Sequence, residues 1–533
     1  MEQKSSFNVE EIKISTDRST FSNFNDVDTT HIHFDWFVNF DESVLEGSIT
    51  LRMITKNETQ TVFLDTWQLD VSKVTLTQAE DTKEVKFKIG EEIAIGSKME
   101  IDLGAPIASS TVFALKIEYK THPDSKALSW LGPDQTLEKE YPYLFSQSEP
   151  IYARCIFPCQ DTPSVKSPYS ATVKVKSPMT VLLSADIEKE TEEGEFKIVE
   201  FKMDMPIPSY LVSIAAGNIA FRKIGERCGI YAEGTFVDTC AKEFEDMEKF
   251  LQVGEEILFK YPLKNYFVVI LPPSMPYGGM ENPITTFATP TIIVGDKSAV
   301  NVVCHEITHS WTGNYLTNSS WEDFWLNEGF TRYIEAKTIH RLYGEEAHKL
   351  HLKEALSSLH SILQAKSGKG SGCVLIPEIA DHQNPDDVLG GTQYEKGYYF
   401  LFFLEKLVTE EHMLTFLREY LKKREGGNIN TREFVIDFID FVKSKFNESE
   451  SNEILGQIDW KAWFYDGGLP PVIHDSEFEG WSQMEKIFNE FKEGKNPEDV
   501  SAVTSDPALT IAFTQKIMLE EGKFVMFARP NIL

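Results

Sequence analysis

Two short motifs constrain the fold of this chain more than any other feature, because together they call for two helices that share one metal ion. The first is His305-Glu306-Ile307-Thr308-His309, and the second is an Asn-Glu-Gly segment that contains Glu328. On a helix, residues four positions apart project from one face, so His305 and His309 can bind a single Zn²⁺. Glu328, at the start of a second helical stretch, can complete a tetrahedral site that keeps one position open.

Glu306 is the fourth polar group of these motifs. It lies one step round the helix from the histidines, where it cannot bind the ion comfortably but can reach a metal-bound water as a general base. An open ligand position is typical of a catalytic zinc rather than a structural one. The alternative is a surface helix whose histidines are only solvated, and the Asn-Glu-Gly segment makes it the weaker interpretation. We therefore predict one Zn²⁺ bound by His305, His309 and Glu328.

The charge and composition of the chain exclude several classes of partner. Its 533 residues include 52 Lys and Arg against 83 Asp and Glu, a formal net charge of −31, which argues against nucleic acid or an anionic membrane. No apolar run approaches the roughly 20 residues that span a bilayer. Six cysteines are too few for a disulfide framework, and the N-terminus lacks the apolar core of a secretory signal. We expect a cytoplasmic protein with no obligate partner.

The periodicity of apolar residues changes along the chain. Phe34, Trp36 and Val38 alternate with polar residues, which is the period of a half-buried strand, and similar runs recur up to 210–212. Helical spacing starts near Ala241 and predominates over 300–460. A Gly/Pro-rich segment then predicts a linker, with two amphipathic helices after it. The expected domains are an all-β domain at 1–217, a domain with the metal motif at 218–465, and a linker with a short helical domain at 466–533.

The chain also resembles a known family. The segments that carry the resemblance to the zinc aminopeptidases of the aminopeptidase N family are 277–283, 305–314 and 325–329. The segments that narrow it to the leukotriene-A(4) hydrolase/aminopeptidase branch are 158–166, 394–397, 460–463 and 468–471. The resemblance implies a multidomain α+β fold with a saddle-like N-terminal β domain and a thermolysin-like mixed α/β zinc domain. It also implies a C-terminal helical domain, which is shortened in this chain.

The same resemblance implies roles for residues outside the metal motif. Tyr394 is the expected hydrogen-bond donor to the oxyanion, and Glu281 the expected carboxylate for the free amine of the substrate. Glu149 stands where this branch typically has glutamine, and it adds a second carboxylate for that amine. The expected substrate-binding residues are Gln147, Ser148, Glu149, Pro276, Tyr277, Gly278, Gly279, Met280 and Glu281, with Lys523 as a candidate contact for a peptide C-terminus.

Three functions remain open at this stage. The favoured one is a zinc-dependent aminopeptidase that releases N-terminal residues from short peptides. The second is a bifunctional enzyme that also opens a leukotriene-type epoxide, which Asp387 and Lys523 support and which Glu149 and Val525 oppose. The third is an inactive, truncated binding module, which only the short C-terminal part supports.

Overall fold

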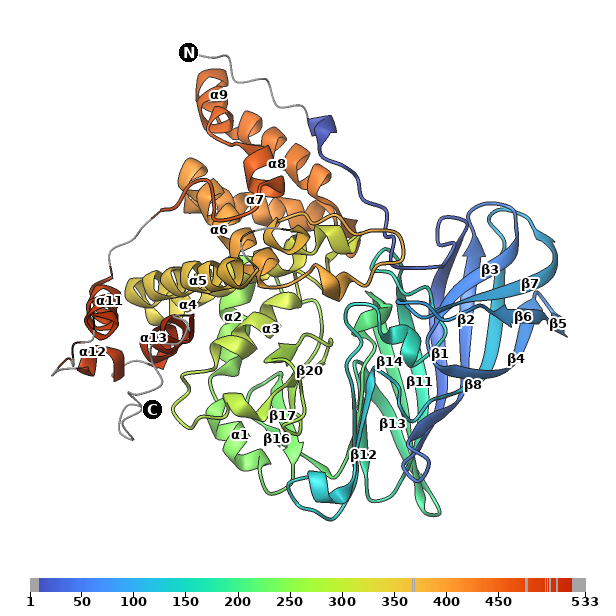
Figure 1. The fold of residues 1–533 in the computed structure, drawn as a ribbon. Coiled ribbons are helices and arrows are strands. Elements are labelled where there is room, and N and C mark those ends of the chain that lie inside the picture. The colour runs from blue at the N-terminus through green and yellow to red at the C-terminus, as the bar shows by residue number, and fades with distance from the viewer. Residues whose placement is uncertain are drawn as a thin grey trace.

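The structure is a computed structural model that describes residues 9–366, 368, 370–474, 478–493, 495, 497, 500–504 and 507–519. Its N-terminal part is built from strands, and most of the remainder is helical, so the fold is mixed α+β (Figure 1). Two large apolar clusters are buried, one among the N-terminal strands and one among the helices. None of the helices in the described ranges has both the length and the apolar character to cross a membrane.

The N-terminal part contains three sheets, and several of their longer strands alternate buried with more exposed side chains. An eight-stranded sheet has the order β13-β14-β11-β1-β2-β8-β4-β5, a four-stranded sheet β12-β15-β10-β9, and a three-stranded sheet β3-β7-β6. The strands are β1 (Val27–Asn39), β2 (Val44–Thr55), β3 (Thr59–Thr66), β4 (Leu69–Gln78), β5 (Asp81–Glu84), β6 (Lys86–Ile89), β7 (Ser97–Ile107), β8 (Val112–Thr121), β9 (Leu128–Leu131), β10 (Tyr143–Ser146), β11 (Lys166–Lys176), β12 (Thr180–Leu183), β13 (Asp186–Glu193), β14 (Phe196–Pro208) and β15 (Ile214–Gly217).

The predicted alternation in β1 is confirmed, and one predicted strand is not. Phe34, Trp36 and Val38 are buried, and β1 pairs parallel with β11 and antiparallel with β2. The segment expected to be a strand near 210–212 is instead part of a 3₁₀ turn, Ser209–Leu211. Pro208 directly precedes that turn, and proline fixes φ near the value that such a turn requires.

A further, five-stranded sheet lies next to the helices and has the order β16-β17-β18-β20-β19. Strands β17, β18 and β20 are parallel, while β19 pairs antiparallel with β20 and forms the edge of this sheet. Its strands are β16 (Ile219–Lys223), β17 (Cys228–Glu233), β18 (Tyr266–Ile270), β19 (Gly279–Met280) and β20 (Thr285–Ala288). The edge position of β19 leaves one side of its backbone without a strand partner in the described sheet.

The helical part begins with two short helices near Ala241, where helical spacing starts in the sequence. Phe244 and Asp246 separate α1 from α2, with backbone angles outside the regular helix. The helices up to residue 465 are α1 (Val237–Glu243), α2 (Met247–Ile257), α3 (Asn301–His309), α4 (Trp325–Tyr343), α5 (Glu345–Ala365), α6 (Gly391–Val408), α7 (Glu410–Lys423), α8 (Thr431–Lys445), α9 (Glu448–Gly456) and α10 (Trp460–Tyr465). A two-stranded parallel pair, β21 (Thr317–Asn318) and β22 (Asn428–Ile429), lies between them.

Helices α4 and α6 approach each other closely at two glycines. A Cβ built on Gly329 would lie 2.7 Å from the Cα of Gly397, and one built on Gly397 would lie 2.8 Å from the Cα of Gly329. Such contacts are shorter than real side chains allow, so these positions need residues without a Cβ. Glu328 and Tyr394 flank this contact in the sequence. The two glycines therefore set how close these residues' helices come.

We expect Gly397→Ala to lower the unfolding temperature, because the added carbon would push two backbones apart. The expected loss of stability is about 1–3 kcal/mol, as for other overpacked cores. A matched control is Gly456→Ala in α9, where a Cβ would meet nothing within 4 Å. Thermal unfolding of both variants checks this, and equal unfolding temperatures would contradict the close-packing interpretation.

The last described helices form a small cluster of their own. They are α11 (Glu479–Lys492), α12 (Ser501–Thr504) and α13 (Pro507–Leu519). Trp481, Met484 and Phe513 belong to their buried core, and Leu350 of α5 packs against it. Figure 1 shows this cluster beside α4 and α5, on the opposite side from the N-terminal strands. The domain division at residues 217/218 and 465/466 stays a prediction.

Candidate metal centre

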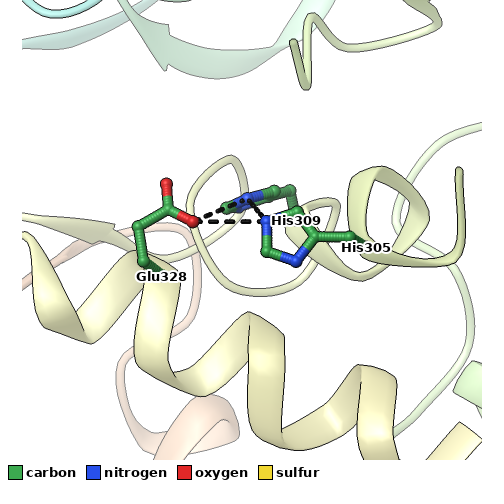
Figure 2. A group of neighbouring side chains, drawn as sticks. All are labelled: His305, His309 and Glu328. Atoms are coloured by element: carbon green, nitrogen blue, oxygen red, sulfur yellow. Dashed lines mark hydrogen bonds and ion pairs between the residues drawn. The ribbon is translucent and has the colours of Figure 1, made fainter. Parts of the chain in front are cut away.

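Helices α3 and α4 bring the three predicted metal ligands together. His305 and His309 project from one face of α3, and Glu328 lies in the first turns of α4 (Figure 2). The Nε2 atoms of the two histidines are 3.0 Å apart, and each is 3.3 Å from Oε2 of Glu328. His309 and Glu328 are buried, while the His305 side chain is 14% exposed. The spacing of the motifs thus gives the expected juxtaposition.

Hydrogen bonds from the other ring nitrogens orient both histidines. Nδ1 of His309 donates to the carbonyl oxygen of Thr312 at 2.9 Å, and Nδ1 of His305 donates to Oε2 of Glu335 at 3.1 Å. These bonds place a proton on each Nδ1, which leaves the Nε2 lone pairs directed at Glu328. Gly313 makes room for this arrangement, because a Cβ there would lie 2.8 Å from Nδ1 of His309.

This arrangement fits a zinc ion. Three acceptor atoms converge on one point, and Oε2 of Glu328 is buried without a hydrogen-bond partner in the described residues. Ligand atoms bound at zinc distances around a tetrahedral ion stand about 3.3 Å from one another, which matches the spacing here. Such convergence of lone pairs is unfavourable unless a cation lies among them. His305, His309 and Glu328 therefore suit one Zn²⁺.

The electrostatics of the metal-free centre also favour a positive charge there. Burial disfavours charged imidazoles, yet the neighbouring carboxylates of Glu328 and Glu335 raise the pKa of His305 to about 9. Burial likewise disfavours the Glu328 carboxylate, yet His309 and His305 lower its pKa to about 2. Protons on the histidines thus take the place that a bound cation would occupy.

Glu306 lies beside this triad with its carboxylate close to the edge strand β19. A Cβ on Gly279 would be 2.2 Å from Oε1 of Glu306, so only glycine leaves that oxygen its space. Burial raises the pKa of the Glu306 carboxyl, and the two histidines oppose this effect. A carboxyl with a raised pKa is a suitable acceptor and donor of a proton near neutral pH.

A cavity of about 600 Å³ opens over these residues. Its wall combines residues of the loop that follows strand β10, of the edge strand β19 and of helices α3, α4 and α6. The residues that line it are Glu149, Pro150, Tyr277, Gly278, Gly279, Met280, Glu281, Asn301, Val302, His305, Glu306, His309, Phe324, Glu328, Arg332, Glu335, Asp386, Leu389, Gly390 and Tyr394. Most of the predicted site residues therefore face one space.

Carboxylates gather at one end of this cavity. Oxygens of Glu149, Glu281 and Glu328 lie within 4.8 Å of one another. Oε1 of Glu149 and Oε1 of Glu281 are buried and have no hydrogen-bond partner among the described residues. Burial raises the pKa of both carboxyls, and their mutual repulsion raises the pKa of Glu149 further. Asn314 fixes this segment, since its Nδ2 donates to the carbonyl oxygen of Glu281 at 2.7 Å.

Tyr394, in the first turn of α6, lies on the metal side of the cavity. Its ring stacks on His305, with centroids 6.0 Å apart and planes inclined by 16°. Phe324 contacts the same ring edge-on. Burial and the neighbouring carboxylates, Glu328 foremost, raise the pKa of the Tyr394 hydroxyl well above its usual value. The phenol therefore stays protonated and can donate a hydrogen bond.

Four predicted site residues do not line the cavity. Gln147 lies behind its wall and donates to Sδ of Met280 at 3.1 Å, Ser148 is buried, and Pro276 is exposed. Asp387 is replaced at the wall by its neighbour Asp386, because consecutive residues of the 3₁₀ turn Pro385–Asp387 point in different directions. The role predicted for Asp387 stays a prediction. Lys523 and Val525 lie outside the described residues.

Sequence reasoning missed two charged residues of the wall, Arg332 and Glu335. Both follow Glu328 on α4, one and two turns later, so a helical projection from Glu328 would have placed them on its face. Glu335 is fully buried, and it accepts the Nδ1 proton of His305. Arg332 pairs with Glu335 at 2.8 Å. This pairing between neighbours on one helix has no distinct sequence signature.

The chain is similar to known proteins over most of its length. The chain matches the model of the Peptidase M1 N-terminal domain over residues 28–211 and that of the Peptidase family M1 domain over residues 242–463. It is 35% identical to leucine aminopeptidase 2 of Candida glabrata over 513 residues, which cover 94% of this chain and 76% of that protein. It is 36% identical to leucine aminopeptidase 2 of Chaetomium globosum over 510 residues, with 92% and 81% covered.

Solved structures share the fold. The structure of yeast LTA4 hydrolase in complex with bestatin superposes with a TM-score of 0.85 at 31% identity, covering 98% of this chain and 83% of that one. An M1 zinc metallopeptidase from Deinococcus radiodurans superposes with a TM-score of 0.63 at 20% identity, covering 84% and 96%. The second likeness concerns the fold alone.

Proposed function

The chain belongs to the peptidase M1 family of zinc aminopeptidases, and on that premise we propose that it removes N-terminal residues from short peptides at the cavity over α3. His305, His309 and Glu328 would hold one Zn²⁺. The observation that carries this proposal is the pair of carboxylates, Glu149 and Glu281, beside the triad. Two buried oxygens of Glu149 and Glu281 have no partner among the described residues and need a positive one, which the ammonium group of a peptide N-terminus supplies.

The residues around the triad supply the remaining chemistry of peptide hydrolysis. When bound, Zn²⁺ lowers the pKa of a water molecule and polarises the scissile carbonyl. Glu306 takes a proton from the attacking water and delivers it to the leaving amine as the C–N bond breaks. The Tyr394 hydroxyl donates a hydrogen bond to the negative charge that develops on the carbonyl oxygen.

The edge strand β19 gives the substrate its alignment. Gly279 and Met280 pair with β20 on one side, so an extended peptide can add as a further strand on the other. Gly279 also lies against Glu306, which brings the added strand next to the general base. The free amine of the peptide's first residue would then lie at Glu281, which directly follows β19.

The test compares fluorogenic aminoacyl amides that carry a free amine with their N-acetylated counterparts. We expect rapid release only from the free amines, with loss of activity in a chelator and recovery on addition of zinc. Equal rates on both substrates would refute the amine site. Absence of chelator-sensitive release from either substrate would refute the proposed function as a whole.

Tyr394→Phe is expected to lower kcat by about 10²–10³-fold and to leave KM nearly unchanged. The phenol contacts the oxyanion, which exists only beyond the ground state, so its loss acts on the transition state. Steady-state kinetics on one aminoacyl amide measure both constants, and the zinc content serves as control. A higher KM at unchanged kcat would mean that Tyr394 binds substrate instead.

A second candidate activity is the opening of a leukotriene-type epoxide, in which water adds across the ring to give a diol. Asp386 favours it, because this carboxylate lies at the cavity wall and accepts a hydrogen bond from Tyr152 at 2.7 Å. Asp386→Asn and Asp387→Asn, assayed with an epoxide, test which aspartate matters. We expect diol formation to fall only in Asp386→Asn, and unchanged formation in both variants would remove the aspartate from this candidate.

The cysteines bear on the cellular setting. All six cysteines are buried and form no disulfide, which favours a reducing compartment, and we keep the cytoplasm as the expected location. An inactive binding module is the remaining alternative from the sequence. Turnover by the zinc-loaded chain in the assay above would exclude it.

A further inference from the structure

An ion network connects the helices behind the metal centre. The guanidinium of Arg332 on α4 bonds both oxygens of Glu335 through one nitrogen, at 3.0 and 2.8 Å. Its second terminal nitrogen reaches the Glu395 carboxylate on α6 at 3.5 and 3.3 Å. Glu335 is fully buried, and the side chains of Arg332 and Glu395 are 15% and 11% exposed. One cation therefore bridges two carboxylates on different helices.

Each end of this bridge adjoins a residue of the proposed chemistry. Glu335 accepts the Nδ1 proton of the zinc ligand His305, so its position sets the direction of that imidazole. Glu395 directly follows Tyr394 in the first turns of α6. The rings of His305 and Tyr394 also stack on each other at the cavity wall. The bridge thus links α4 to α6, and the stacked rings link α3 to the same first turns of α6.

We propose that Arg332 is a positioning residue that holds the zinc ligand His305 and the oxyanion donor Tyr394 in register, acting through Glu335 and Glu395. This role rests on the functions proposed for His305 and Tyr394. It adds that Arg332 sets the positions of these two residues relative to each other. The planar guanidinium suits it, because a fork of donors can fix two carboxylates at once. A lysine offers one point charge, which cannot hold both in the same geometry.

Direct substrate binding by Arg332 is the less favoured interpretation. Both terminal nitrogens of its guanidinium already bond protein carboxylates. Only Nε lacks a partner in the described residues, and that atom is buried. The negative charges of Glu335 and Glu395 also offset the positive charge of Arg332, which an anionic ligand would need. The guanidinium therefore lines the cavity with both terminal nitrogens already engaged by protein carboxylates.

The test is a double-mutant cycle of Arg332→Lys with Tyr394→Phe. We expect Arg332→Lys alone to lower kcat by about 10- to 100-fold with KM within twofold, as for loss of an outer partner of a metal site. At saturating zinc, which keeps the weakened metal site filled, the same change in the Tyr394→Phe background should lower kcat less than threefold, because the donor that Arg332 positions is already gone. A merely structural role would instead give equal losses in both backgrounds, and that result would overturn the proposal.

A second readout does not depend on turnover. Competition with a zinc-binding dye should show weaker zinc affinity in Arg332→Lys by about 10-fold or more, since Glu335 then holds His305 less firmly. Arg341→Lys is the matched control, on the same helix and in an ion pair with Glu410 away from the cavity. Unchanged zinc affinity together with unchanged kcat in Arg332→Lys would refute the proposal. Absence of turnover in the wild-type chain would refute the proposed function, while the zinc competition would still test whether Arg332 supports His305.

Discussion

Replacing Glu306 by glutamine is expected to lower kcat on an aminoacyl amide by about 10²–10⁴-fold, the usual contribution of a general acid–base group. Glutamine has nearly the same shape but cannot accept the proton of the attacking water at neutral pH. Glu306 has no hydrogen bond to a metal ligand, so His305, His309 and Glu328 should keep their positions. The loss should therefore appear in kcat rather than in zinc binding.

The measurement pairs steady-state kinetics with metal analysis on the same sample. We expect Glu306→Gln to retain the zinc content of the wild type while turnover falls. Loss of both would mean that the substitution disturbs the metal site, so it would not test the base. Wild-type turnover with full zinc content would show that Glu306 is not the general base.

Gly279→Ala is the second substitution with a large expected effect. The added Cβ would lie 2.2 Å from Oε1 and 2.5 Å from Cδ of Glu306, so the carboxylate must move away. Displacement of a catalytic group by about 1 Å can cost 10²-fold in rate, and we expect a loss of about that size. The backbone at Gly279 does not need a positive φ, so alanine introduces no local strain there.

Gly278→Ala provides the comparison for this prediction. A Cβ at Gly278 would meet Cγ1 of Val302 at 3.6 Å, which is an ordinary contact. We expect its effect on kcat to be far smaller than that of Gly279→Ala, with similar unfolding temperatures for both variants. Equal losses in the two variants would indicate a general effect on the edge strand rather than displacement of Glu306.

The sequence predicted the metal triad because its ligands follow from local periodicity. Two histidines one turn apart on α3 must share a face, and a glutamate in the first turns of the next long helix needs only the α3–α4 packing to reach them. The alternation in β1 was predictable for the same reason. The roles of these residues remain proposals, but their proximity follows from the pattern.

Other features depend on tertiary contacts that no pattern shows. The 3₁₀ turn at Pro385–Asp387 decides that Asp386, and not Asp387, faces the cavity. The Arg332 bridge joins α4 to α6, and nothing in either helix alone indicates its partner. Gly329 and Gly397 lie in segments 325–329 and 394–397, which carry the family resemblance. Only the structure shows that the two glycines contact each other where α4 and α6 cross.

The most direct test of the central claim is a zinc titration of the metal-free chain, followed by hydrolysis of an aminoacyl amide. The account predicts no turnover without metal, a linear rise with added zinc, and a plateau at one zinc per chain. The triad of His305, His309 and Glu328 provides one such site in the described residues. Full turnover of the metal-free chain, or a plateau that requires a second ion, would contradict it.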